Sequence, residues 1–322
     1  MRRRPVLFGL LAVAVLIFAA RIVAGRGIRP VSVAQATPVA CTTARDPAGI
    51  GTPLLLANGI AHANLYNAQT SSGVIRQCYG SSGVATNIDL RTVSPVMPGP
   101  VGYPEVAYGY HLYDRPFCPM CQAQPFPLRV LALRRYGSHA RVTAAYSLGR
   151  PSPRSLPRDF IYDLWLERHP APDAAPRPRD IELLIFLYYH EPNATCLPSP
   201  IPSAFSTPIS SKGRRVLSHW SVCRLNGGTR ATPVAFFLRH PTPSLAGDIS
   251  LPLNAMIGEA GQFVGEDLRR YLLMGIELGG EFGQCSATAG CGTSGAKWSW
   301  RISRLVLEGT PTSIPIVFPG GG

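Results

Sequence analysis

The stretch YLLMGIELGGEFGQC, from Tyr271 to Cys285, combines a mostly apolar strand pattern with two carboxylates and several glycines. Because side chains alternate between the two faces of a strand, Glu277, Gly279 and Glu281 share one face and apolar residues occupy the other. Glycine weakens a strand, so its place between two acids is expected where a ligand must approach the backbone closely. The pattern predicts a strand with one core face and one acidic, functional face.

Two other runs have the same design. The run DIELLIFLYYH places Glu182, Leu184 and Phe186 on one face, and the run FIYDLWLE places Asp163 and Trp165 on one face. A carboxylate among apolar residues is costly unless it faces a site or a partner. For each acid alone, a solvated residue of an edge strand is the more ordinary interpretation. Three strands with the same face pattern favour a shared site.

The chain as a whole reads as an all-β domain. Gly and Pro number 32 each, and 46% of the residues are hydrophobic, which favours short strands and turns over long helices. The pattern predicts an antiparallel sandwich with a single helix in the segment PLNAMIGEAGQFVGEDLRRYLL. The runs that we interpret as strands include residues 102–113, 128–136, 141–148, 159–167, 181–190, 231–240, 271–282 and 298–308.

The N-terminus has the composition of a targeting segment. Three arginines precede an apolar run from Pro5 to Ala20, which is short for a membrane span of about 20 residues. We expect export, with the leader either cleaved or retained as a membrane anchor. The expected organisation is a leader over residues 1–26, a Pro/Ala/Thr-rich linker over 27–50 and one domain over 51–318.

Eight cysteines after an export signal favour disulfides. Their spacing suggests local pairs, although spacing alone does not fix the connectivity. A redox dithiol at CPMC is disfavoured because prolines surround it, and a zinc site does not suit an oxidising compartment. The suggested local pairs are Cys118 with Cys121, Cys196 with Cys223, and Cys285 with Cys291, which leaves Cys41 with Cys78 as a fourth pair.

Several function classes lack support in the sequence. The formal net charge is +13, but six of the arginines belong to residues 1–29, and no basic run is interleaved with aromatics. A nucleic-acid interface is therefore not expected. The sequence holds neither a G-x-S-x-G motif nor a phosphate-binding G-x-x-x-x-G-K-[ST] loop. We expect no cofactor, and no second histidine has the spacing to His111 of a metal site.

Two carboxylates that face each other across a sheet, with aromatics beside them, suit glycoside hydrolysis. One carboxylate acts as nucleophile or base, and the other has a raised pKa and protonates the leaving oxygen. At these residues the sequence resembles glycoside hydrolase family 12, which holds mostly endo-β-1,4-glucanases and xyloglucanases. The resembling segments, in order from about Leu65, are GYPEVAYG, FIYDLWL, DIELLIFLYY, YLLMGIELGGEFG and KWSWRISRLVLE.

The resemblance implies a fold and roles for the acids. It implies a β-jelly roll, a sandwich of two antiparallel sheets with a concave cleft and one packed helix. By position, Glu182 matches the nucleophile and Glu281 the general acid/base, while Asp163 matches the acid that accompanies the nucleophile. Family members retain the anomeric configuration, which implies carboxylates about 5–5.5 Å apart.

The resemblance also implies residues that would bind the substrate. Cleft tryptophans of the family are replaced here by Tyr66, Tyr113 and Phe186, which offer a sugar ring less stacking area. These replacements put the usual cellulosic substrate in doubt. The full expected set is Tyr66, Glu105, His111, Tyr113, Trp165, Phe186 and Glu277.

The sequence thus predicts an exported, retaining endo-β-glycanase that acts as a monomer. Its substrate would be a β-1,4-glucan-type polysaccharide, whether cellulose-like, mixed-linkage or xyloglucan, cleaved by double displacement. The main alternative is a non-catalytic carbohydrate-binding jelly-roll protein of the cell envelope. A pure binder has no need of apposed acids, so Glu182, Glu281 and Asp163 together favour the enzyme. A structural envelope protein that merely has the fold is a further alternative that the acids disfavour.

Overall fold

The computed structural model places Thr37–Gly322 in one compact unit. The residues that it describes are 40–44, 53–56, 59–95, 100–109, 126–135, 140–150, 158–169, 176–190, 196–198, 200–226, 231–282, 294–309 and 314–315. The predicted leader lies outside these residues. The described part of the chain contains no helix that is long and apolar enough to cross a membrane.

Strands dominate the described structure. In chain order they are β1 (Ala40–Ala44), β2 (Leu54–Leu55), β3 (Ile60–His62), β4 (Ala68–Gly80), β5 (Gly83–Pro95), β6 (Glu105–Gly109), β7 (Leu128–Arg129), β8 (Arg141–Leu148), β9 (Arg158–Glu167), β10 (Ile181–His190), β11 (Ser203–Ser211), β12 (Arg214–Arg224), β13 (Thr232–His240), β14 (Ala246–Pro252), β15 (Leu272–Phe282), β16 (Ser294–Glu308) and β17 (Ile314–Pro315). The all-β prediction is therefore confirmed.

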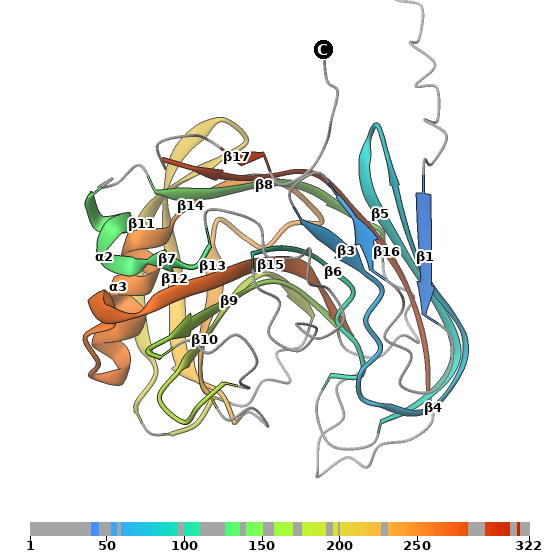
Figure 1. Ribbon diagram of the computed structural model, residues 1–322, viewed down its shortest axis with the longest axis horizontal. Coiled ribbons are helices and arrows are strands. Elements are labelled where there is room, and N and C mark those ends of the chain that lie inside the picture. The colour runs from blue at the N-terminus through green and yellow to red at the C-terminus, as the bar shows by residue number, and fades with distance from the viewer. Residues whose placement is uncertain are drawn as a thin grey trace, which may run out of the picture. The chain divides into compact units, whose positions relative to one another are not determined.

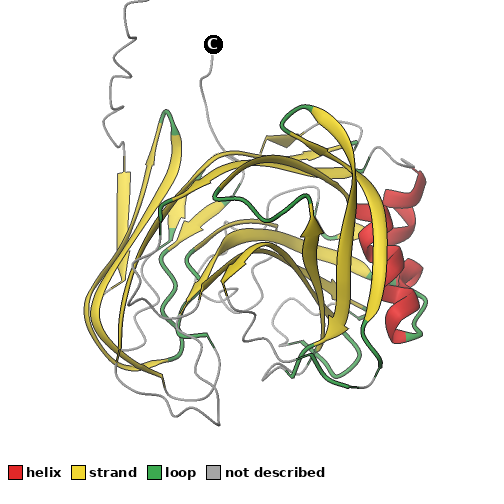
Figure 2. Ribbon diagram, turned by 180° about the vertical axis from the view of Figure 1, so that it is seen from behind, coloured by secondary structure: helices red, strands yellow, loops and turns green. Residues whose placement is uncertain are grey.

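The strands form one strongly curved sheet that folds back on itself. Hydrogen-bonded neighbours run in the order β3–β6–β15–β9–β10–β13–β12–β11–β14–β8–β16–β5–β4–β1. Figure 1 shows β6, β15 and β9 in one layer beneath β8, β14 and β16, and Figure 2 shows the same layers from behind. Two details differ from the predicted pair of antiparallel sheets. The short pairing of β11 with β14 joins the layers, and β10 runs parallel to β13.

The core lies between the two layers, because each central strand turns its apolar face inward. The main core cluster takes alternate residues from β9, β10 and β15, and β16 supplies two tryptophans from the other layer. Burial of such side chains stabilises the fold by about 25 cal/mol per Å² of apolar surface. These core residues are Tyr162, Leu164, Leu183, Ile185, Ile276, Leu278, Trp298 and Trp300.

Helix α3, Leu253–Val264, lies within the segment expected to be helical. It buries Met256, Ile257 and Ala260, whose spacing fits one helical face. The helix ends at Gly265, which adopts the left-handed conformation that favours glycine, with φ of 71°. In Figure 2 the helices lie beside the curved strands rather than between the layers.

The expected strand over residues 128–136 is wrong for most of its length. After the two residues of β7, the chain forms helix α2, Val130–Arg135. Its sequence VLALRR is rich in strong helix formers. Val130 and Leu133, three residues apart, are buried, whereas Leu131 is exposed, which is helical and not strand spacing.

Two of the four suggested disulfides are confirmed. Cys41 bonds Cys78, and Cys196 bonds Cys223. The first disulfide joins β1 to β4, so residues 40–44 of the expected linker are a strand paired with β4. The other two suggested pairs, Cys118 with Cys121 and Cys285 with Cys291, lie outside the described residues.

The glycines of β15 are explained by packing. A Cβ added at Gly279 would lie 2.3 Å from the carbonyl oxygen of Pro104 and 2.7 Å from the Cα of Glu105. On the other face, a Cβ added at Gly280 would lie 2.7 Å from the Trp298 ring. The expectation that glycine makes room for a ligand is therefore wrong for Gly279, because the chain that enters β6 takes that space.

We expect Gly279→Ala to destabilise the protein by about 1–3 kcal/mol, because a backbone carbonyl cannot move aside as a flexible side chain can. Urea unfolding measures the effect. Gly258→Ala is the control, since no atom lies within 4 Å of its added Cβ and Ala stabilises a helix interior by up to about 1 kcal/mol. A Gly279→Ala protein as stable as the wild type would contradict the packing explanation.

Candidate active site

Seven carboxylates occupy the face of the curved sheet that is turned away from the core. We call this surface of β6, β9, β10 and β15 the acid face. Strand pairing places them there, because each alternates with residues of the main core cluster. All except Glu281, which is partly buried, are buried. They are Glu105, Asp159, Asp163, Glu167, Glu182, Glu277 and Glu281.

The pairing register brings three of these acids together around β9. Glu277 of β15 lies directly opposite Asp163 of β9. On the other side of β9, Asp163 faces Leu184 of β10, and Glu182 lies two residues before Leu184 on the same face. Diagonal neighbours of this kind are about 7–8 Å apart at Cα, within the reach of long side chains. Asp163 therefore lies between Glu182 and Glu277.

Asp163 is in an environment that disfavours its charge. Burial, followed by the charges of Glu182, Glu277 and Glu281, raises the pKa of Asp163 well above its ordinary value. Its Oδ1 atom is buried and has no hydrogen-bond partner among the described residues. A carboxyl with a raised pKa keeps its proton and can donate a hydrogen bond to a neighbouring carboxylate.

Glu281 lies in a different row of the sheet. It is directly opposite Asp159, four residues along β15 from Glu277, which is about 13 Å of strand. Burial and then the charges of Asp159 and Glu182 raise the pKa of Glu281 well above its ordinary value. This direction favours the protonated form of Glu281, as a general acid requires.

An apolar row separates the two groups of acids. It contains Gly279, Ile161 and Phe186, which are paired across β15, β9 and β10, and Phe237 of β13. The rings of Phe186 and Phe237 are stacked with centroids 4.4 Å apart. The acid face thus has one group at Asp163, Glu182 and Glu277 and a second at Asp159 and Glu281.

Two aromatic residues expected to stack on sugar are buried. Phe186 is 1% exposed, and Phe237 covers one face of its ring. Trp165 is 2% exposed and packs with Ala231 and Met274. In this structure both rings are covered by neighbouring residues, and their role in binding a sugar stays a prediction. His111 and Tyr113 lie outside the described residues.

Tyr66 lies near the acids, and its substrate-binding role stays a prediction. Tyr66 is 44% exposed. Among the described aromatic residues that were expected to bind substrate, it is therefore the one whose ring is open to a ligand. Burial of its hydroxyl, followed by the charges of Glu281, Glu182 and Asp163, raises the pKa of Tyr66 well above its ordinary value. The hydroxyl therefore stays neutral and can donate a hydrogen bond.

Glu105 is held by the protein itself. Its carboxylate lies 3.2 Å from Nδ1 of His62, and both side chains are 0% exposed. Its backbone carbonyl accepts a hydrogen bond from the Gln77 side chain at 3.0 Å. The buried pair with His62 gives Glu105 a partner within the protein, and its substrate-binding role stays a prediction.

Sequence reasoning missed Asp159, His62 and Tyr103. Asp159 had a detectable signal, because it shares the face of Asp163 four residues away on one strand. Tyr103 donates a hydrogen bond to the Ile161 carbonyl at 3.3 Å, and His62 pairs with a residue 43 positions away. Both contacts join residues far apart in the chain, so no short sequence motif indicates them. Among the described residues, no group of three His, Cys, Asp or Glu side chains could hold a metal ion.

The fold is similar to known carbohydrate-active enzymes. A family 12 xyloglucanase from Bacillus licheniformis in complex with ligand is 16% identical, with a TM-score of 0.54 over 83% of this chain and 97% of that chain. The native form of a family 12 xyloglucanase from the same organism is 15% identical, with a TM-score of 0.54 over 85% and 99%. The native structure of the endo-1,4-β-glucanase CelB2, a cellulase, is 18% identical, with a TM-score of 0.51 over 81% and 99%.

In sequence, no protein-family model and no curated protein matches the chain. The similarity is thus one of structure, and it extends over nearly the whole length of the known enzymes. This confirms the resemblance that the sequence motifs indicated. The chain has the fold of the family 12 glycoside hydrolases across most of its length.

Proposed function

We propose that the protein is an exported endo-β-glycanase that cleaves β-1,4-glucan-type polysaccharide with retention of configuration. The observation that carries the proposal is the group of Glu182, Asp163 and Glu277 on one buried face of the sheet. Similar structures include a xyloglucanase and an endo-1,4-β-glucanase, which supports this class of substrate. The disulfides suit an oxidising compartment outside the cytoplasm.

The proposed reaction proceeds in two steps. The Glu182 carboxylate attacks the anomeric carbon while a second carboxyl gives its proton to the departing glycosidic oxygen. Water then attacks the glycosyl–enzyme ester, and the second carboxylate takes back a proton. Asp163 keeps its proton because its pKa is raised by burial and by Glu182, and it can hydrogen-bond Glu182, which must be ionised to attack.

Two glutamates of β15 compete for the role of acid/base. The family resemblance assigns this role to Glu281, and burial and the charge of Asp159 raise the pKa of Glu281, which suits an acid. The register favours Glu277, which lies opposite Asp163 and in the group that contains Glu182. Glu281 lies opposite Asp159, four residues along β9 from Asp163, so the register places it farther than Glu277 from the row of Glu182. Retention needs carboxylates about 5–5.5 Å apart, so we propose Glu277 as the acid/base.

The first prediction separates these roles. Glu182→Ala should abolish hydrolysis, whereas Glu277→Ala should lower it by about 10²–10⁴, the usual contribution of acid–base help. With a dinitrophenyl cellobioside, azide should restore turnover of Glu277→Ala and give a β-glycosyl azide, because the anion occupies the space of the lost carboxylate. Azide with Glu182→Ala should give the α-glycosyl azide. Product anomers are determined by NMR.

Glu281→Ala is the matched control on the same strand and face. We expect it to lose less than about tenfold in activity and to gain nothing from azide. The reverse pattern, with β-azide formed by Glu281→Ala alone, would move the acid/base to Glu281. An active Glu182→Ala protein would contradict the proposed function itself.

The second prediction concerns pH and stability. In the folded state Asp163 keeps its proton to a higher pH than in the unfolded state, because burial raises its pKa. As pH rises above the ordinary value near 3.8, the unfolded chain releases this proton first, so stability falls until the native pKa is passed. Asp163→Asn cannot ionise and should escape this loss.

We therefore expect Asp163→Asn to raise Tm by a few degrees at pH 7 relative to wild type, with a smaller difference at pH 3. About 1 kcal/mol corresponds to about 2–4 °C in a domain of 150–250 residues. Scanning calorimetry at both pH values measures the change. A catalytic role predicts that activity falls while stability rises. A variant that is less stable at pH 7 than at pH 3, compared with wild type, would contradict the electrostatic account.

A further inference from the structure

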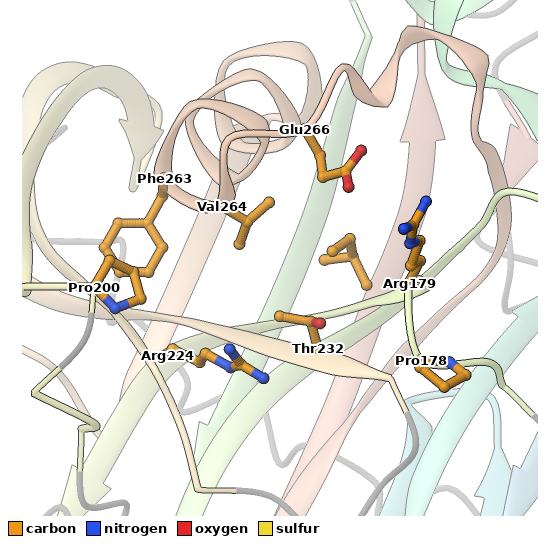
Figure 3. Close-up of a pocket in the computed structure, with 9 residues that line it drawn as sticks. Pro178, Arg179, Pro200, Arg224, Thr232, Phe263, Val264 and Glu266 are labelled. Atoms are coloured by element: carbon orange, nitrogen blue, oxygen red, sulfur yellow. The ribbon is translucent and has the colours of Figure 1, made fainter.

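A cavity of about 280 Å³ lies where β10 and β13 begin, next to the C-terminal end of α3 (Figure 3). In this view Phe263 and Pro200 are on the left, Arg179 and Pro178 on the right, Glu266 above and Arg224 below. Its walls therefore come from segments far apart in the sequence. The lining residues are Pro178, Arg179, Ile181, Pro200, Arg224, Thr232, Phe263, Val264 and Glu266.

The cavity is separate from the acid face. Ile181 lines it and belongs to the main core cluster, whereas the next residue, Glu182, belongs to the acid face. Adjacent residues of a strand point to opposite faces, so the cavity opens on the other side of β10 from the proposed nucleophile. A ligand in this cavity would not occupy the position of the scissile bond.

Three charged side chains around the cavity have no internal partner. Arg179, Arg224 and Glu266 make no side-chain hydrogen bond or ion pair with any described residue. Two guanidinium groups and one carboxylate give the lining a net positive charge. Unpaired charges that gather at one cavity favour an anionic ligand that also has hydroxyl groups to donate.

The backbone that carries these charges is fixed. Both carboxylate oxygens of the buried Asp180 accept hydrogen bonds, from the amides of Arg168 at 3.0 Å and Arg177 at 2.6 Å. The Tyr271 hydroxyl donates to the Arg179 carbonyl at 3.1 Å, and the Glu266 amide donates to the Gly261 carbonyl at 2.9 Å. The fold therefore fixes the backbone of the site, while the side chains of Arg179 and Arg224 are exposed and free to reach a ligand.

The remaining wall is apolar. Phe263 and Val264 are half-buried at the end of α3, and Pro178, Pro200 and Ile181 complete the lining. An aromatic ring suits the C–H face of a sugar, while arginine forks bind a carboxylate through two parallel hydrogen bonds. The volume is just below the usual 300–1,000 Å³ of sites for drug-sized ligands, so it suits a single ring.

We propose that this cavity binds one sugar unit that carries a carboxylate, such as a uronic acid residue of a polysaccharide. Arg224 and Arg179 bind the carboxylate, Glu266 accepts hydrogen bonds from ring hydroxyls, and the ring packs on Phe263. This site anchors acidic polysaccharide to the enzyme at a distance from the reaction. It goes beyond the proposed function, because binding here requires no catalysis.

The test is a titration of the full-length protein with methyl β-glucuronide, methyl β-glucoside and acetate, followed by amide NMR shifts. We expect shifts at Thr232, Gly265 and Glu266, with the glucuronide binding at least tenfold more tightly than either the glucoside or acetate. Equal binding of the glucuronide and glucoside would overturn the role of the carboxylate. Equal binding of the glucuronide and acetate would overturn the role of the sugar ring.

Variants locate the site. Arg224→Gln should weaken glucuronide binding at least tenfold, and Phe263→Ala should weaken it while acetate binding stays unchanged. Arg215→Gln is the matched control, an exposed arginine of the same strand β12 that lies outside the cavity. Unchanged glucuronide binding in Arg224→Gln would overturn the proposal, as would shifts confined to the acid face around Asp163. An inactive protein that still binds glucuronide would contradict the proposed hydrolysis and leave this site standing.

Discussion

The position of β9 between β10 and β15 is the constraint on which the rest of the structure depends. One face of these three strands must pack apolar side chains against the tryptophans of β16. Strict alternation then forces every second residue onto the opposite face, where Asp163, Glu182 and Glu277 meet. Crowding buried carboxylates costs stability, which the core between the layers offsets. Burial, followed by repulsion from the neighbouring acids, raises the pKa of Asp163, and a raised carboxyl pKa suits the proton transfer that we propose.

Alternation along a strand could be predicted from the sequence, and the acid face follows from it. The pairing of strands distant in the chain could not. Glu277 and Glu281 share a face, and only the register of β15 against β9 separates them into different rows. In the same way, the burial of Phe186 depends on Phe237 of the parallel neighbour β13, and that pairing has no local signal. Pro104 lies far from Gly279 in the sequence, so the sequence does not reveal that Pro104 occupies the space beside Gly279. The pattern alone therefore suggested room for a ligand there.

Some elements that differ from the prediction have a local signal in the sequence. The spacing of Val130 and Leu133 and the helix formers between them indicate the helix α2, which a β-rich context obscured. The sequence signals of α3 and of the Cys196–Cys223 disulfide are local or nearly so, whereas Cys41 and Cys78, 37 residues apart, are the two cysteines that the local pairs leave over. Many different sequences can satisfy one pattern of alternating apolar and polar faces. This explains how the chain shares its fold with family 12 enzymes at 15–18% sequence identity.

The central claim is that Glu182 forms a covalent bond to the substrate sugar. Incubation with a 2,4-dinitrophenyl 2-deoxy-2-fluoro-β-cellobioside tests it most directly, because the fluorine slows hydrolysis of the ester more than release of the activated leaving group. The account predicts a stoichiometric gain in mass by one fluoroglycosyl unit, and peptide mapping should place that unit on Glu182. A glycosyl unit on Glu277, Glu281 or any other residue would contradict the account, as would an active enzyme that is never labelled.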